Sequence, residues 1–383
     1  MSVQCAAILS RYYRYIFWYF PPQLTDIDMS KPFITALVDT YNHEAFIEAA
    51  INSVIEQDFE AADTEILVVN DGSTDGTLEL LRKFAPRIRI LSKANGGQGS
   101  AFNAAIPEAR GAIVAFLDGD DWWAPGKLTA VAEAFGSDAS VGLVGHGITE
   151  VYTDGRRRTE VPRKISRFRI DSTEEAKTFR MRKCFLGTSR MAYRTEILRR
   201  IGCVPEVLRF EADEYLFTLA GLFADVMILP TSFTYYRLHD NNLFQFTKGD
   251  AQSIRRKQAV LAALAQSLEQ QFLLNKIAPN IARVIVECVE VEADVLRLTA
   301  DSGFPWETLS TELKIMRIFH SDVSTLQYIF SRARLLPATV LPSRTYYRWR
   351  RWLTESPYYK SFRQKHLPFP VQSHVDRQEN SAP

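Results

Sequence analysis

Residues 33–57 read FITALVDTYNHEAFIEAAINSVIEQ, a short apolar run followed by a stretch with helical spacing of its apolar residues. The first part predicts a buried strand and the second an amphipathic helix. The same alternation returns in EILVVNDGSTD at 65–75, IRILSKANGGQG at 88–99 and AIVAFLDGDD at 112–121, each followed by a helical pattern. These units predict an α/β fold, in which a mostly parallel sheet is flanked by helices.

Polar or flexible residues follow each of the four predicted strands. Ligands on such sheets bind beyond the carboxyl ends of the strands, which meet at one edge. The four strand ends therefore predict a common site at this edge. They are Asp39-Thr40-Tyr41-Asn42, Asn70-Asp71-Gly72-Ser73, Asn95-Gly96-Gly97-Gln98 and Asp118-Gly119-Asp120-Asp121.

The alternation weakens after residue 141, where the basic stretch 156–169 predicts a loop. From about residue 250 the pattern is helical. We therefore expect three parts: an N-terminal extension at 1–30, an α/β domain at 31–248, and a helical C-terminal region with a basic-aromatic tail at 249–383. A start of translation at Met29 is an alternative explanation for the first residues.

The composition is that of a globular protein. Among 383 residues, 46% are hydrophobic and 24% charged, and the net charge of +1 gives no global reason to expect nucleic-acid binding. The four cysteines form no CxxC pair, so neither a zinc ribbon nor a disulfide framework is indicated. We expect a cytoplasmic protein, because scattered cysteines fit a reducing compartment.

Three acids end the fourth predicted strand, in AFLDGDDWW at 115–123. The carboxylates of Asp118, Asp120 and Asp121 repel one another, and the apolar strand before them cannot solvate them. A divalent cation would relieve this repulsion, and Mg²⁺ commonly combines one or two carboxylates with substrate phosphate oxygens. The alternative is a solvated acidic turn.

Two further motifs are weak when each is taken alone. In DGSTDGT at 71–77, Asp71 could accept hydrogen bonds from a base or sugar, although DGST is more often a turn and helix cap. The glycine-rich NGGQGSAFN at 95–103 is similar to a phosphate cradle. It lacks the lysine of a Walker A loop and does not fit GxGxxG.

The combination of motifs is far more specific. LVDTYN, NDGSTDGT, NGGQGSAFN and FLDGDDWW, in that order, resemble the nucleotide-binding half of the family 2 glycosyltransferases, which have the GT-A fold. The resemblance covers roughly Phe33 to Asn242. It implies an inverting, nucleotide-sugar-dependent transferase that uses Mg²⁺ or Mn²⁺.

The resemblance also implies roles for individual residues. Asp118 and Asp120 would form the family's Asp-x-Asp pair, with Asp120 as the direct metal ligand and His239 near the metal or diphosphate. Asp39 departs from the family, which more often has Pro or Ser there. The implied donor-binding residues are Thr40, Tyr41, Asp71, Asn95, Gly96 and Asp118.

A catalytic base is implied farther along, in FEADEYLF at 210–217, and we assign it to Asp213. Its alternative role is that of a helix-capping acid. His239 has the alternative role of a surface histidine, whereas Arg237 could pair with phosphate. Trp122 and Trp123 would pack on the acceptor side or in the core.

The tail segment 341–365 mixes seven Lys and Arg residues with Tyr and Trp. Such segments suit an anionic membrane surface, and we expect peripheral contact at the inner face of the membrane, with a solvated helix as the alternative. The partners implied are a nucleotide-sugar donor and a saccharide, lipid-linked or protein acceptor, in surface polysaccharide or glycoconjugate synthesis. A sugar-phosphate nucleotidyltransferase and a non-catalytic sugar-nucleotide-binding protein are the competing functions.

Overall fold

The computed structural model describes residues 33–239, 242, 251–300, 303–319, 335–355 and 371–376. The predicted extension at 1–30 lies outside the described residues. The predicted boundary at 248/249 and the tail residues 356–365 also lie outside them. None of the described helices has the length and apolar character needed to cross a membrane.

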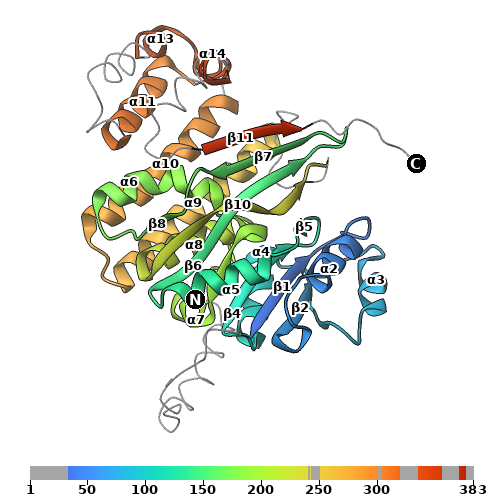
Figure 1. The fold of residues 1–383 in the computed structure, drawn as a ribbon. Coiled ribbons are helices and arrows are strands. Elements are labelled where there is room, and N and C mark those ends of the chain that lie inside the picture. The colour runs from blue at the N-terminus through green and yellow to red at the C-terminus, as the bar shows by residue number, and fades with distance from the viewer. Residues whose placement is uncertain are drawn as a thin grey trace.

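One eleven-stranded sheet forms the centre of the molecule (Figure 1). Its main path runs β11-β7-β6-β9-β4-β1-β2-β3, while β10 pairs with β5, β6 and β8. The first four strands are parallel to one another, which confirms the predicted βαβ units. The strands are β1 Ile34–Thr40, β2 Thr64–Asn70, β3 Arg89–Ser92, β4 Ile113–Asp118, β5 Trp122–Trp123, β6 Val141–Val151, β7 Arg157–Pro162, β8 Ser166–Phe168, β9 Ala192–Arg194, β10 Asp225–Arg237 and β11 Val371–Asp376.

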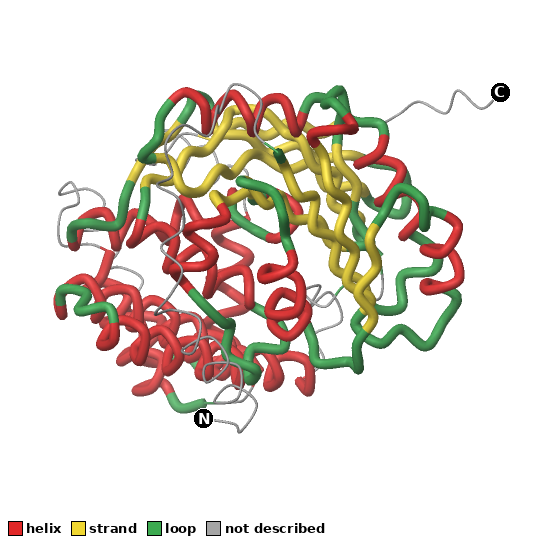
Figure 2. The backbone as a smooth tube through the Cα atoms, turned by 90° about the horizontal axis from the view of Figure 1, so that it is seen from below, coloured by secondary structure: helices red, strands yellow, loops and turns green. Residues whose placement is uncertain are grey.

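Helices cover both faces of this curved sheet, as Figure 2 shows. The α/β class, the flanking helices and the helical C-terminal region are thereby confirmed. The helices are α2 Ile47–Ile55, α3 Thr77–Lys83, α4 Gln98–Ala105, α5 Lys127–Ser137, α6 Thr173–Arg182, α7 Thr195–Ile201, α8 Ala212–Phe223, α9 Ala251–Leu274, α10 Pro279–Ala300, α11 Pro305–Phe319, α13 Leu335–Val340 and α14 Ser343–Glu355, with short 3₁₀ turns η1 Ala61–Asp63, η2 Ile106–Glu108, η3 Lys183–Phe185 and η4 Thr188–Arg190.

The parallel strands bury both faces, because their side chains alternate between two cores. Leu37 and Phe116 belong to one core, which they share with α4, α7, α8, α9 and α10. Ala36 and Leu117 belong to the other core, with α2, α3 and α5. This two-sided burial explains why these strands are continuous apolar runs in the sequence.

The second half of the sheet is mixed, and here one expectation was wrong. The basic stretch 156–169 contains β7 and β8 instead of a loop. The charged residues of β7 are only partly buried, so the strand lacks an apolar run that would mark it. Near the C-terminus, β11 pairs antiparallel with β7 and interrupts the helical region.

The C-terminal helices α9 and α10 share a hydrophobic core with one face of the sheet. Leu264 and Leu268 of α9 and Ile285 of α10 lie in the same cluster as Leu216 and Leu219 of α8. A second small cluster joins α10, α13 and α14 through Leu298, Ala338, Tyr346 and Tyr347. The helical region from α9 onward is therefore attached to the α/β part by burial.

A matched pair of leucines on α9 tests this shared core. Leu264 is fully buried, and Leu264→Ala should lower the free energy of unfolding by about 2–5 kcal/mol in one cooperative transition. Leu273 is 77% exposed, so Leu273→Ala should change the free energy of unfolding by less than about 0.5 kcal/mol. Denaturant titration measures both; a separate early transition for Leu264→Ala would contradict the shared core.

Candidate active site

The carboxyl ends of the four parallel strands lie at one edge of the sheet, as the alternation predicted. Asp39 and Asp118 are aligned in the register of β1 with β4. Asp39 comes two residues after Leu37, and Asp118 comes two residues after Phe116. Both acidic side chains therefore lie on the same face of the sheet as these core residues, the face that packs against α4 and α8. Asp71 directly follows β2, two residues after Val69 of the same core. The predicted acids are therefore brought to one side of this edge.

The turn after β4 fits tightly against the end of β1, and Gly119 is what permits this. Its amide donates to Asp39 O at 2.9 Å. A Cβ atom at Gly119 would lie 2.7 Å from Thr40 Oγ1 and 2.8 Å from His43 Nδ1. Since real Cβ contacts are longer, a side chain there would displace the acids on either side.

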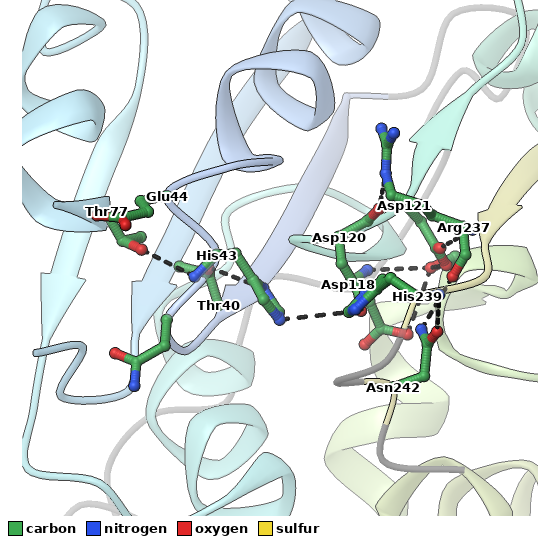
Figure 3. A network of polar contacts seen from close by, with 12 residues as sticks. Thr40, His43, Glu44, Thr77, Asp118, Asp120, Asp121, Arg237, His239 and Asn242 are labelled. Carbon is green, nitrogen blue, oxygen red and sulfur yellow. Dashed lines mark hydrogen bonds and ion pairs between the residues drawn. The ribbon is translucent and has the colours of Figure 1, made fainter. Parts of the chain in front are cut away.

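Two histidines lie on either side of Asp120 (Figure 3). His239 Nε2 is 3.1 Å from Asp120 Oδ2, and His43 Nε2 is 3.9 Å from the same oxygen. Burial alone would raise the pKa of Asp120, but the His239 hydrogen bond and the two imidazoles outweigh it, and this pKa lies below its usual value. The ring of His239 also packs 4.6 Å from that of Phe46. Asp120 and His239, the two predicted metal ligands, are thus in contact.

Asp121 points away from this group and holds the turn in place. Ser189 Oγ donates to Asp121 Oδ2 at 2.6 Å and accepts from the Asp118 amide at 3.0 Å. The amide of Arg237 donates to Asp121 Oδ1 at 3.0 Å, and the buried Lys127 ammonium donates to Ser189 O at 2.7 Å. Only two of the three acids in the turn are therefore available to a ligand.

The carboxylates remain crowded even with these partners. Asp39 Oδ1 is buried and accepts no hydrogen bond, and burial raises the pKa of this carboxyl to about 7. Burial, and then the charges of Asp39 and Asp120, raise the pKa of Asp118 well above its usual value. Neighbouring carboxylates repel one another and cannot all be ionised at once. Their oxygens are also the ligands that a hard divalent cation prefers. Within the described ranges, no group of three or more His, Cys, Asp or Glu side chains is arranged to hold a metal ion, so a cation at Asp120 would need ligands from substrate.

Asp213 lies across from these acids, in the first turn of α8. It accepts a hydrogen bond from the Glu214 amide at 2.8 Å. Burial raises the pKa of Asp213, although the hydrogen bond from the Glu214 amide and the charge of the Arg190 guanidinium both lower it. Its charge in turn contributes to the raised pKa values of Asp39 and Asp118. The predicted base is therefore within electrostatic range of the Asp-x-Asp turn.

Asp71 is occupied within the protein. Its carboxylate accepts from Lys93 Nζ at 2.6 Å and from the amides of Gly96 at 3.0 Å and Gly97 at 2.7 Å. Asn95 Nδ2 donates to it as well, at 3.2 Å. Four donors engage both oxygens of a side chain that is only 4% exposed. In this arrangement Asp71 holds the loop after β3 in place.

The glycines of that loop allow a second segment to approach closely. A Cβ atom at Gly97, whose φ is +83°, would lie 2.6 Å from Arg209 O, and one at Gly99 would lie 2.6 Å from Leu208 O. Arg209 Nη2 donates to Asn95 Oδ1 at 2.5 Å. The loop is thereby packed against the segment that leads into α8, which explains its glycines without a phosphate.

Thr40 and Tyr41 differ in accessibility. Thr40 is buried, whereas Tyr41 is 43% exposed at the strand end. The next residue ties this end to the DGST turn, because Asn42 Oδ1 accepts from the Thr74 amide at 2.7 Å and its amide donates to Ser73 Oγ at 2.9 Å. The ends of β1 and β2 are therefore fixed to each other beside an accessible ring.

Sequence reasoning missed two residues of the site. His43 follows β1 by three positions, so the polar strand end could have identified it. Ser189 precedes β9 and reaches Asp118 from 71 positions along the chain, for which the sequence holds no signal. Trp122 stacks on Tyr235 with ring centroids 5.0 Å apart, and Trp123 is 2% exposed, so both tryptophans pack within the protein.

The C-terminal helices reach α8 and its flanking segment through partly buried ion pairs. Lys183 Nζ lies 2.5 Å from Glu214 Oε1 and 3.3 Å from Glu292 Oε2 of α10. Lys257 Nζ of α9 lies 3.4 Å from Glu211 Oε1. Glu211 directly precedes α8 and has a left-handed backbone conformation. The start of α8 is therefore held from the C-terminal side as well.

Comparison with known proteins gives these residues a family context. The family model described as glycosyl transferase family 2 matches residues 35–202, which include the four strand ends, whereas Asp213 and His239 lie beyond it. An uncharacterized glycosyltransferase of Nostoc sp. is 34% identical over 223 residues, or 55% of this chain and 66% of that relative. The uncharacterized glycosyltransferase EpsJ of Bacillus subtilis is 32% identical over 221 residues, or 55% of this chain and 63% of that relative.

The matched part of the chain thus spans slightly less than two thirds of these curated relatives. Among solved structures, the chain is similar to the mannosyltransferase PcManGT from Pyrobaculum calidifontis, described in complex with GDP-Man and Mn²⁺. That similarity covers 94% of this chain and 95% of the other, with a TM-score of 0.49 and 19% sequence identity.

The packing of Asp71 generates a stability prediction. Asp71→Ala leaves the partly buried amides of Gly96 and Gly97 and the Lys93 ammonium without an acceptor and should lower the free energy of unfolding by about 3 kcal/mol. As a control, Asp58→Ala removes an exposed carboxylate and should change it by less than about 0.5 kcal/mol. Denaturant unfolding measures both variants, and equal midpoints for Asp71→Ala and the wild type would contradict this role.

Proposed function

We propose that the protein is an inverting glycosyltransferase that moves a sugar from a nucleotide-sugar donor to an acceptor hydroxyl; the match of residues 35–202 to the glycosyl transferase family 2 model supports this. The observation that carries this proposal is the group of Asp118, Asp120 and His239 at the end of the parallel sheet, together with Asp213, whose charge acts on Asp118. The match to this family model does not favour the nucleotidyltransferase alternative.

We place the nucleotide of the donor over the ends of β1 and β2. The exposed ring of Tyr41 offers an accessible surface to a base or ribose beside the buried Thr40. Asp71, Asn95 and Gly96 form the adjoining wall, where the hydrogen bonds of Asp71 fix the loop. The donor diphosphate would then point toward the Asp-x-Asp turn.

A divalent metal, Mg²⁺ or Mn²⁺, would be held by Asp120 and His239, with Asp118 beside them. The unpartnered oxygen of Asp39 and the raised pKa values around it fit a cation in this place. When bound, such an ion neutralises the charge of a nucleoside diphosphate leaving group. Substrate phosphate oxygens would supply the ligands that the protein lacks.

Asp213 acts as the general base in this proposal. The acceptor oxygen forms a bond to the anomeric carbon as the bond from that carbon to the diphosphate oxygen breaks, and the hydroxyl proton passes to Asp213. Attack from the side opposite the leaving group inverts the anomeric centre. Burial supports this role, because it raises the pKa of the carboxyl and makes it a stronger base than an exposed Asp.

The acceptor belongs to surface polysaccharide or glycoconjugate synthesis in our proposal, as a saccharide, a lipid-linked saccharide or a protein. Asp213 requires only a hydroxyl within hydrogen-bond distance and a cleft beside α8 to hold it. The fixed position of α8, held by Lys183 and Lys257, supports a site that orients the acceptor accurately.

Replacement of the base gives the first functional prediction. Asp213→Asn keeps the size of the side chain but cannot accept the proton, so kcat should fall by at least about 100-fold with little change in the donor KM. Asp58→Asn, an exposed substitution, is the control and should keep wild-type kcat. Initial rates of nucleoside diphosphate release across a panel of nucleotide sugars measure both. Near-normal turnover of Asp213→Asn would refute the assignment.

A binding measurement tests the metal independently of turnover. A nucleoside diphosphate with Mn²⁺ should raise the melting temperature of the wild-type protein, because a ligand of the native state stabilises it. The shift should disappear under chelation and in Asp120→Asn, while Asp58→Asn, at an exposed position, should keep it. A shift of the same size with chelator present would argue against a metal-dependent donor site.

A further inference from the structure

The helix α14 has two different faces, and only one packs on the protein. Tyr346 is fully buried and Tyr347 is 5% exposed. Both lie in the small core formed with Leu298 of α10 and Ala338 of α13. These two tyrosines of the basic-aromatic segment therefore serve packing.

The opposite face of α14 is basic and ends in a tryptophan. Arg344, Arg348 and Arg351 are exposed, and Trp352 is 67% exposed. Spacings of four and three residues place these four side chains on one side of a helix. Arg350 lies on the packed side, where it donates to Glu312 at 2.6 Å. We call the four exposed residues the outer face of α14.

Exposed apolar side chains are concentrated on α11, on α13 and in the turn before α11, which lie next to α14. The turn before α11 lies beside the start of α14, because the Ser343 amide donates to Gly303 O at 3.2 Å. The 303–355 part of the chain carries half of the large apolar side chains that the described residues expose. Figure 1 shows α11, α13 and α14 at one end of the molecule, away from α2 and α3. These side chains are Phe304, Trp306, Leu313, Leu336, Val340 and Trp352.

We propose that the outer face of α14, with the exposed apolar side chains beside it, docks the protein on an anionic lipid membrane. Arginines in this position attract negative headgroups. Tryptophan and leucine gain from entering the boundary between headgroups and acyl chains. An anionic polymer would use the arginines but leave the exposed Phe304, Trp306 and Val340 in water. The combination of both residue types favours a lipid surface.

The docking surface is joined rigidly to the rest of the protein. Leu298 of α10 packs under α14, and Glu292 on the same helix pairs with Lys183 beside α8. A membrane bound at α14 would therefore be at a fixed position relative to the α/β part. This inference goes beyond the proposed function and does not depend on it.

Flotation of the full chain with lipid vesicles tests the proposal. The wild-type protein should float with vesicles of phosphatidylcholine containing about one third phosphatidylglycerol, and not with phosphatidylcholine alone. The double variant Arg344→Gln, Arg348→Gln should bind the anionic vesicles about 25-fold more weakly, at about fivefold for each charge removed. Trp352→Ser should weaken binding at unchanged net charge.

The matched control removes two exposed arginines from the α/β part, Arg87→Gln with Arg199→Gln, and should float like the wild type. Melting temperatures of all variants check that they are folded. Three results would overturn the proposal: equal flotation with neutral vesicles, unchanged flotation of the Arg344 and Arg348 variant, or self-association in solution that the same variant abolishes.

Discussion

Repulsion among carboxylates at the ends of β1 and β4 is the constraint on which the site depends. The parallel register places Asp39 beside Asp118, and the tight turn at Gly119 brings Asp120 onto the same edge. Asp213 adds a further acid from α8. Folding these groups together costs free energy unless charge is neutralised. The raised pKa values of Asp39 and Asp118 and the histidines beside Asp120 reduce this charge, and a bound cation would reduce it further.

The same turn also connects the two halves of the molecule. Asp121 is held by Ser189, which precedes β9, and by the amide of Arg237 at the end of β10. The loop after β3 makes a second connection, because it packs on the backbone of Arg209 just before α8. Both halves therefore fix the position of the acids, and α9 and α10 share the core behind them.

The sequence predicted the parallel half well, because strands buried on both faces appear as uninterrupted apolar runs. It also predicted Asp120 and His239 as metal ligands; the structure brings these two side chains into contact, and their role stays a prediction. Three features depended on tertiary contacts and could not be predicted: the charged strand β7, the partners of Asp71, and Ser189. The two faces of α14 were also hidden, since both its buried and its exposed sides contain aromatic residues.

The position of a bound metal tests the central claim most directly. Crystals grown with Mn²⁺ and a nucleoside diphosphate should show an anomalous scattering peak about 2.0–2.2 Å from a carboxylate oxygen of Asp120, beside His239 and the diphosphate. A diphosphate bound at the strand ends with no metal next to Asp120, or a metal bound elsewhere, would contradict the account.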